Sequence, residues 1–275
     1  MQSMTEKPDQ PDDFFMSDAP EATDALADRM SDALTKSAEP SPGDAPAAET
    51  ALEEEKVKDE IDIQIDLLKD PEWTARREAV VTLGEMGDER CVEPLVSALR
   101  DGDWQVREAV IEALGQVGSP AVERLIKVLR DWDLRKSVIR ALGKIKDERV
   151  LDPLMQLLHN DEFKHDATEA LIELGTPAVE QLVGALKHKD EGVRQQAIIA
   201  LGRIKDAAAI DPLIEMLKDS DWFSRLTAAA ALEKLGDERG RQAIKPLMKD
   251  PDMVVRMRVE RILAAWNKNK ATANA

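Results

Sequence analysis

A leucine followed by a turn recurs about every thirty residues from Asp70 onward. The spacings are 31, 28, 29, 30, 31 and 31 residues, and the anchor leucines are Leu83, Leu114, Leu142, Leu171, Leu201, Leu232 and Leu263. A basic residue stands seven positions before each anchor, at Arg76, Arg107, Arg135, Lys164, Arg194, Arg225 and Arg256. A period of this length over seven copies indicates a solenoid, in which each unit buries its apolar faces only against its neighbours.

Each unit is predicted to form two helices. In the second copy, six apolar residues fall at offsets 0, 3, 4, 7, 8 and 11, which is one stripe of an α-helix: Val106, Ala109, Val110, Ala113, Leu114 and Val117. Gly118 is suited to end that helix, because glycine adopts the left-handed backbone of a C-cap without strain. Lys146 and Lys205 stand where other copies have glycine. A left-handed lysine would cost about 1 kcal/mol or more, so a different turn is expected at both positions.

The chain divides where its charge changes. Residues 1–55 hold 15 acidic residues against 3 basic ones, a net charge of −12, while residues 56–275 hold 40 against 35, a net charge of −5. High net charge with few large apolar side chains predicts a disordered acidic N-terminal arm over residues 1–55. Phe14-Phe15-Met16 and the stretch 21–34 could fold on a partner, or they are incidental residues of a solvated tail.

The remainder of the chain is predicted to contain three parts. Residues 56–69 are expected to form a capping helix, since the first repeat needs a cover for its exposed apolar face. Residues 70–266 are expected to form the repeat solenoid, and residues 267–275 a polar C-terminal tail.

Two segments carry a resemblance to a known family. Val-Arg-Glu-Ala-Val-Ile-Glu-Ala-Leu-Gly-Gln-Val-Gly (106–118) and Val-Arg-Gln-Gln-Ala-Ile-Ile-Ala-Leu-Gly-Arg-Ile (193–204) resemble HEAT repeats of the phycobilisome-lyase type, and the likeness covers about residues 60–266. The resemblance implies an all-α fold, a right-handed α-solenoid (superhelix) of about seven HEAT-like helix pairs, with the second helix of each pair on the concave face. The family includes chromophore lyases, a diiron hydroxylase and plain scaffolds, so it leaves the function open.

The sequence offers no strong catalytic or metal-binding pattern. Deoxyhypusine hydroxylases, which this chain resembles in fold, bind iron through repeated His-Glu pairs. Here the three histidines are followed instead by Asn160, Asp166 and Lys189. Cys91, the only cysteine, is expected to be a buried structural thiol. We therefore expect no catalytic residue, no metal and no cofactor.

A row of tryptophan and arginine residues is the better candidate site. Four tryptophans lie ten residues before an anchor leucine and three before the repeat's arginine. The predicted partner-binding pairs are Trp73 with Arg76, Trp104 with Arg107, Trp132 with Arg135, and Trp222 with Arg225. An i,i+3 spacing places ring and guanidinium on one helix face, and both residue types often dominate protein interfaces.

The same row has a structural alternative. Each tryptophan could cover the seam between repeats while its arginine pairs with a loop aspartate, the candidates being Asp70, Asp101, Asp131 and Asp219. The row stops in the middle of the chain, where Asp161 and Glu191 occupy the tryptophan position. A purely architectural residue would have less reason to stop there, which keeps the binding interpretation open.

These observations favour a soluble, cytoplasmic scaffold or adaptor that binds another protein and is not an enzyme. Nucleic acid is not expected, because the repeat region has an excess of acids and its basic patch of Arg124, Lys127 and Arg130 is small. A membrane-spanning segment is not expected, since no apolar run approaches about 20 residues. The alternative is a lyase, or lyase subunit, that handles a bilin or another tetrapyrrole. A third hypothesis is self-contact, in which the acidic arm covers the tryptophan and arginine row through Phe14 and Phe15.

Overall fold

The computed structural model describes residues 58–273. Between these bounds the chain forms fourteen α-helices, six short 3₁₀ helices and no strand. The predicted disordered arm, residues 1–55, lies outside the described residues, so the arm and its contact with the solenoid stay predictions.

The helices alternate between a long and a short member of each pair. The first, long helices are α3 (Trp73–Met86), α5 (Trp104–Val117), α7 (Trp132–Lys144), α9 (Lys164–Leu174), α11 (Glu191–Ile204), α13 (Trp222–Leu235) and α15 (Met253–Ala273). The second, short helices are α4 (Val92–Ala98), α6 (Val122–Val128), α8 (Leu151–Leu157), α10 (Val179–Ala185), α12 (Ile210–Met216) and α14 (Glu238–Ile244). The 3₁₀ helices are η1 (Glu89–Cys91), η2 (Ser119–Ala121), η3 (Glu148–Val150), η4 (Thr176–Ala178), η5 (Ala207–Ala209) and η6 (Lys245–Lys249).

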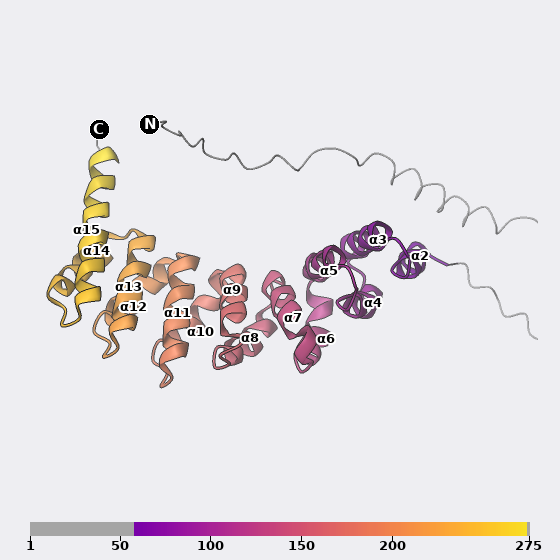
Figure 1. The fold of residues 1–275 in the computed structure, drawn as a ribbon, viewed down its shortest axis with the longest axis horizontal. Helices are drawn as coiled ribbons and strands as arrows, with labels where there is room; N and C mark the ends of the chain where they lie inside the picture. The colour runs from indigo at the N-terminus through magenta and orange to yellow at the C-terminus, as the bar shows by residue number, and fades with distance from the viewer. Residues whose placement is uncertain (1–57, 274–275) are drawn as a thin grey trace, which may run out of the picture. The chain divides into compact units, whose positions relative to one another are not determined.

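The pairs stack in chain order (Figure 1). Each first helix packs against the next first helix, and α4, α6, α8, α10 and α12 each pack against the first helix that follows them. Six pairs are complete, and α15 is the first helix of a seventh whose second helix is absent from the described residues. The predicted all-α solenoid is confirmed.

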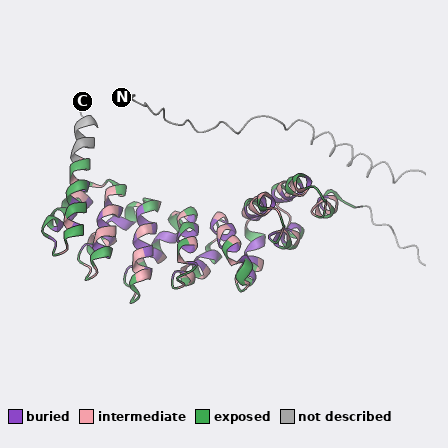
Figure 2. Cartoon of the chain, viewed as in Figure 1, coloured by how far each residue is buried: buried purple, intermediate pink, exposed green. Residues whose placement is uncertain are grey.

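The anchor leucines form the centre of the core. Six of the seven are fully buried, namely Leu83, Leu114, Leu142, Leu171, Leu201 and Leu232. Leu263 is only partly buried, because α15 has a neighbouring first helix on one side alone. Buried residues follow the helices where neighbours meet, and exposed residues gather in the connecting loops (Figure 2). Burial of each leucine contributes about 2 kcal/mol, so the repeated anchor stabilises every interface between repeats.

Glycines after the anchor leucines set how closely the first helices approach. A Cβ added at Gly143 would lie 2.6 Å from the Cα of Ala170 on the next first helix. A Cβ added at Gly84 would lie 2.7 Å from the Cα of Ala113. A Cβ added at Gly202 would lie 2.6 Å from the Cβ of Ala231. No side chain fits in these gaps without displacing a helix.

The two lysines at the glycine position end their helices differently. α7 ends at Lys144 and continues into an extended Ile145 with φ −84°, so the turn at Lys146 differs from the glycine turns as expected. Lys205 is left-handed, with φ 61° and ψ 33°, and its N–H donates to the carbonyl of Leu201. The expectation of a different turn at Lys205 is wrong, because this C-cap hydrogen bond and the packing of α11 hold the strained residue in place.

Single helices stand at the two ends of the described array. α2 (Glu60–Leu67) begins with a capping box at Asp59 and packs against α3. The Asp59 carboxylate also accepts a hydrogen bond from Arg90, 2.7 Å away. At the other end α15 runs to Ala273, so the predicted polar tail continues the helix that far. No helix within 58–273 combines the length and apolarity required to cross a bilayer.

Candidate functional site

Tryptophans occupy the first position of four first helices, α3, α5, α7 and α13. Equivalent positions of successive first helices meet, as Gly143 and Ala170 do, so the first helices run in the same direction and these tryptophan positions lie along one edge of the array. Trp104 is 65% exposed, Trp132 55% and Trp222 42%, whereas Trp73 is half-buried and packs against the core. We call Trp104, Trp132 and Trp222 the tryptophan edge. Large exposed aromatic side chains are unusual on a protein surface and are typical of interaction sites.

The predicted arginine partners bond mainly to loops. The Arg76 Nη1 donates to the carbonyls of Asp70 and Pro71 at 2.9 and 3.1 Å, in the loop before its own helix. Its Nε and Nη2 donate to the Asp101 carboxylate, in the next loop, at 2.7 and 2.8 Å. One guanidinium therefore joins two consecutive loops. The Arg76–Asp101 ion pair is largely buried, and its bidentate hydrogen bonding makes it strong.

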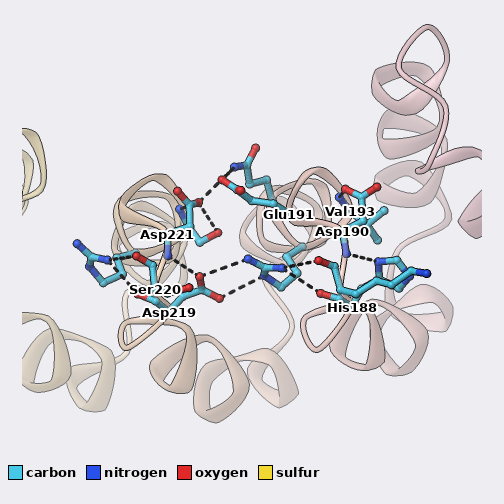
Figure 3. A network of polar contacts seen from close by, with 12 residues as sticks. His188, Asp190, Glu191, Val193, Asp219, Ser220 and Asp221 are labelled. Atoms are coloured by element: carbon cyan, nitrogen blue, oxygen red, sulfur yellow. Dashed lines mark hydrogen bonds and ion pairs between the residues drawn. The ribbon is translucent and has the colours of Figure 1, made fainter.

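The same arrangement recurs near the C-terminal end. Arg225 donates to the carbonyls of Asp219 and Ser220, and to both carboxylate oxygens of Asp250 at 2.8 Å. Figure 3 shows the equivalent network one repeat earlier, around His188, Asp219 and Ser220. There Arg194 donates to the His188 carbonyl at 3.0 Å and pairs with Asp219 at 3.2 Å. We call this chain of contacts the arginine ladder.

The arginine ladder is incomplete in the middle of the molecule. Arg107 donates to the Asp101 and Gly102 carbonyls, but the next aspartate, Asp131, accepts from Arg100 instead. The loop between α6 and α7 has three residues, against five between α4 and α5, and this shortening shifts Asp131. At the next loop the equivalent residue is Asn160, which accepts from the Glu162 N–H as Asp101 does from Asp103.

The predicted stacking of ring and guanidinium is observed at one pair of the described chain. The Arg135 guanidinium lies 5.2 Å from the Trp132 ring centroid and 5.1 Å from that of Phe163. The two rings meet edge to face at 5.1 Å, and Arg135 donates to the Leu129 carbonyl at 2.6 Å. The next loop has Asn160 in place of the aspartate that pairs with Arg76 or Arg225, and the guanidinium of Arg135 lies against the aromatic rings instead.

A hollow of about 550 Å³ lies beside Trp222, between the loops that precede α11, α13 and α15. Glu191 and Asp221 lie on its wall, and the nearby Asp221 carboxylate raises the pKa of Glu191. Burial acts to raise the pKa of Asp221, but hydrogen bonds from Ser224 outweigh it and hold that pKa at about 2. The hollow therefore offers an exposed indole next to charged groups of both signs, which suits a protein side chain better than a small apolar ligand.

The remaining polar candidates do not assemble into a catalytic or metal site. His159 and His188 come from neighbouring repeats and their rings meet at 4.7 Å, while the His188 Nδ1 accepts from the Asp190 N–H. Within residues 58–273, no three metal-ligating side chains cluster in a way that could hold an ion. Cys91 is fully buried, and that burial raises the pKa of its thiol.

The sequence pointed to loop aspartates at Asp70, Asp101, Asp131 and Asp219 as possible partners of the arginines, but it did not show which arginine each one meets. The position that these aspartates occupy lies in the loop before each first helix, and its side chain accepts a hydrogen bond from the backbone N–H two residues later. The residues at this position are Asp70, Asp101, Asp131, Asn160, His188, Asp219 and Asp250. The recurrence of aspartate there was a usable signal. The partner of each arginine, however, lies 25 residues further on, in the following repeat.

The sequence matches the HEAT repeats family over residues 61–133, 121–175, 160–233 and 179–264, which together span nearly the whole described array. A search of curated proteins finds no match to the chain.

Several solved structures are similar to this one. The archaeal HEAT-like repeats protein from Thermococcus onnurineus NA1 is 13% identical, with a TM-score of 0.42 over 77% of this chain and 98% of that chain. The complex of CpcE and CpcF of phycocyanin lyase from Nostoc sp. PCC7120 is 21% identical, with a TM-score of 0.37 over 82% and 100%. Human deoxyhypusine hydroxylase is 21% identical, with a TM-score of 0.38 over 76% and 84%. None of these likenesses bears on function.

Proposed function

The chain belongs to the HEAT-repeat family, and on that premise we propose that it is a protein-binding scaffold whose partner docks along the tryptophan edge. A stacked array of this kind presents a long surface on which many weak contacts add up. The tryptophan edge supplies the anchors, because a buried indole is among the side chains that contribute most to binding.

The observation that carries the proposal is the exposure of three tryptophans at equivalent positions. Trp104 and Trp132 belong to adjacent first helices, whose axes lie about 8–10 Å apart. One partner segment can therefore contact both rings. Trp222, with its neighbouring hollow, is three first helices further along the array and would serve as a separate contact.

We assign different roles to the two members of each predicted pair. Arg76 and Arg225 are engaged by loop carbonyls and carboxylates, so their guanidinium groups hold the edge in shape. Arg135 is the exception, since its guanidinium faces the ring of Trp132 and could contact a partner together with it. Trp73 packs against the core and has little surface to offer.

The test is a comparison of variants of the full chain. Binding partners are captured by cross-linking from a cell extract, identified, and titrated against the chain carrying Trp104→Ala and Trp132→Ala. Each truncation is expected to cost about 2 kcal/mol, a loss of roughly 30-fold in affinity per residue. Met257→Ala is the matched control, because Met257 is also exposed, at 44%, but lies in the interior of α15.

The arginine ladder provides an internal contrast in the same experiment. Arg225→Ala is expected to lower the unfolding midpoint strongly, because it leaves the buried Asp250 carboxylate unpaired. Unchanged partner affinity in the double tryptophan variant, with the fold intact by circular dichroism, would show that the partner binds elsewhere.

A further inference from the structure

The second helix α6 carries the basic residues Arg124 and Lys127, whereas α4, α8, α10 and α12 carry none. Lys127 on α6 and Arg130, two residues after its end, are both exposed, and we call these two residues the α6 ridge. In α4, α8, α10 and α12 the position equivalent to Lys127 is never basic; its occupants are Ser97, Gln156, Gly184 and Glu215. Lys127 is therefore specific to one repeat, whereas the position of Arg130 is also basic after α4, α10 and α12, at Arg100, Lys187 and Lys218.

Two hollows flank the α6 ridge. One, of about 480 Å³, lies between α4 and α6 and has Val128 and Leu134 among its lining residues. The other, of about 820 Å³, lies between α6 and α8 over Ile126, Leu129 and Leu157. Arg130 lines both hollows. The charged residues that line the two are six basic (Arg100, Arg124, Lys127, Arg130, Arg135 and Arg149) and two acidic (Asp131 and Asp152).

Half of these cations already have a carboxylate partner. Arg124 bonds to both oxygens of Glu93, at 2.5 and 2.7 Å, and Arg100 pairs with Asp131. Arg149 pairs with Asp147 at 2.6 Å and with Glu123 at 3.3 Å. In these pairs the positive charge of each arginine is balanced by at least one carboxylate.

The other three cations lack such a partner. Within residues 58–273, neither Lys127 nor Arg130 forms an ion pair with a carboxylate. Arg135 donates to carbonyls alone, because Asn160 stands where other repeats have aspartate. Three uncompensated cations over an apolar floor are unusual in a region where acidic residues outnumber basic ones. Desolvating them is favourable only when a negatively charged ligand arrives.

We propose that the α6 ridge and its flanking hollows bind an acidic peptide segment of a partner protein. The segment carries two or more carboxylates, which pair with Lys127 and Arg130, and a large apolar side chain that enters the hollow over Ile126 and Leu129. This surface lies mainly on the second helices, whereas the tryptophan edge lies at the start of the first helices. The two surfaces meet at Arg135, which lines the larger hollow and faces the ring of Trp132.

The charge distribution favours a peptide over other polyanions. Asp152 and the paired Glu93, Glu123 and Asp131 surround the basic ridge, and a nucleic-acid backbone with its regular charges would meet several of them. A short segment can place its charges on the ridge and avoid the rim.

The first experiment measures peptide binding to the full chain by fluorescence anisotropy. The probe is a labelled ten-residue peptide with the sequence of residues 9–18 of this chain, Asp-Gln-Pro-Asp-Asp-Phe-Phe-Met-Ser-Asp, because it combines four carboxylates with an apolar cluster. Lys127→Glu with Arg130→Glu is expected to weaken binding tenfold or more at low salt, and added salt should weaken binding to the parent chain. Trp104→Ala should leave it unchanged.

The matched control is Lys187→Glu with Lys218→Glu. Lys187 and Lys218 are exposed and occupy, on α10 and α12, the position that Arg130 has relative to α6. The control changes the net charge of the chain by the same amount, so it separates the α6 ridge from overall electrostatics. Equal losses in both double variants, or no binding to the parent chain, would overturn the proposal.

A second measurement identifies what lies in the hollow. Gln156 is exposed and lines the larger hollow, and Gln156→Cys can carry a photo-cross-linker because the native Cys91 is buried. Cross-links to the added peptide that disappear with Lys127→Glu and Arg130→Glu would support the proposal. Cross-links to residues 1–57 of the same chain alone would show that this hollow belongs to the protein's own N-terminal segment and not to a partner.

Discussion

Arg225 and Asp250 form the most buried ion pair of the arginine ladder, with relative exposures of 9% and 5%. We expect Asp250→Asn to lower the free energy of unfolding by about 3–5 kcal/mol, because it leaves a buried guanidinium without its counter-charge. Urea unfolding monitored by circular dichroism measures the loss. Asp211→Asn is the control, since the Asp211–Arg239 pair is exposed and is worth less than about 1 kcal/mol. Equal effects in the two variants would show that burial does not decide the strength of these pairs.

The arginine ladder also predicts how stability depends on pH. Hydrogen bonds from Arg76 and Arg225 lower the pKa of Asp101 and Asp250, respectively. A carboxylate whose folded pKa is depressed adds stability above its unfolded pKa, near 4, and loses that contribution as the pH falls through the folded value. We therefore expect the free energy of unfolding to fall steadily below about pH 4. The Asp250→Asn variant should lose less over this range than the parent chain, and an equal loss would contradict the assignment.

The spacing of the first helices depends on their glycines. Gly143→Ala places a methyl group 2.6 Å from the Cα of Ala170, so α7 and α9 must separate. We expect a loss of about 1–3 kcal/mol in the free energy of unfolding. Gly184→Ala, in α10, is the matched substitution with no atom within 4 Å of the new methyl, and alanine's higher helix propensity should stabilise the chain by up to about 1 kcal/mol. Denaturant titration of both variants compares them directly, and effects of the same sign would contradict this account.

The arginine ladder is interrupted around α6 and α7, and the side-chain contacts there differ from those in the repeats on either side. The short loop before α7 and the substitution of Asn160 for aspartate leave Arg135 next to Trp132 and Phe163. The uncompensated cations of α6 stand in the same region. Both surfaces that we propose for binding therefore include residues of the region where the ion pairing between repeats is interrupted.

At the scale of the whole molecule, the proposed scaffold and the lyase alternative predict different responses to an added bilin. We expect the full chain to leave the absorption spectrum of an added bilin, such as phycocyanobilin, unchanged at equimolar concentration. The proposed scaffold would contact a partner on its surface, whereas a lyase would hold the extended tetrapyrrole in one conformation and so shift its absorption. Ultraviolet–visible spectroscopy measures this, with serum albumin as a positive control for bilin binding. A shifted band at one-to-one stoichiometry would favour the lyase.

The candidate site could be predicted in part from the sequence. The spacing of Trp104 and Trp132 from their anchor leucines places them at the start of first helices, because helical periodicity is a local property. Their exposure could not be predicted, since Trp73 has the same spacing and is half-buried. Burial depends on the neighbouring repeat, which the spacing does not describe.

The sequence by itself determined the helix pairs, the period near thirty residues and the anchor leucines, because apolar periodicity and turn residues act within one repeat. Only the tertiary structure decided which carboxylate each arginine meets. Arg76 donates to the Asp101 carboxylate in the next loop. Arg135 has Asn160 at the corresponding position, and its guanidinium lies against the ring of Trp132. Lys205 likewise keeps a left-handed conformation that its own preference opposes. Contacts between repeats depend on loop lengths and helix separations, and these emerge only when the repeats are stacked.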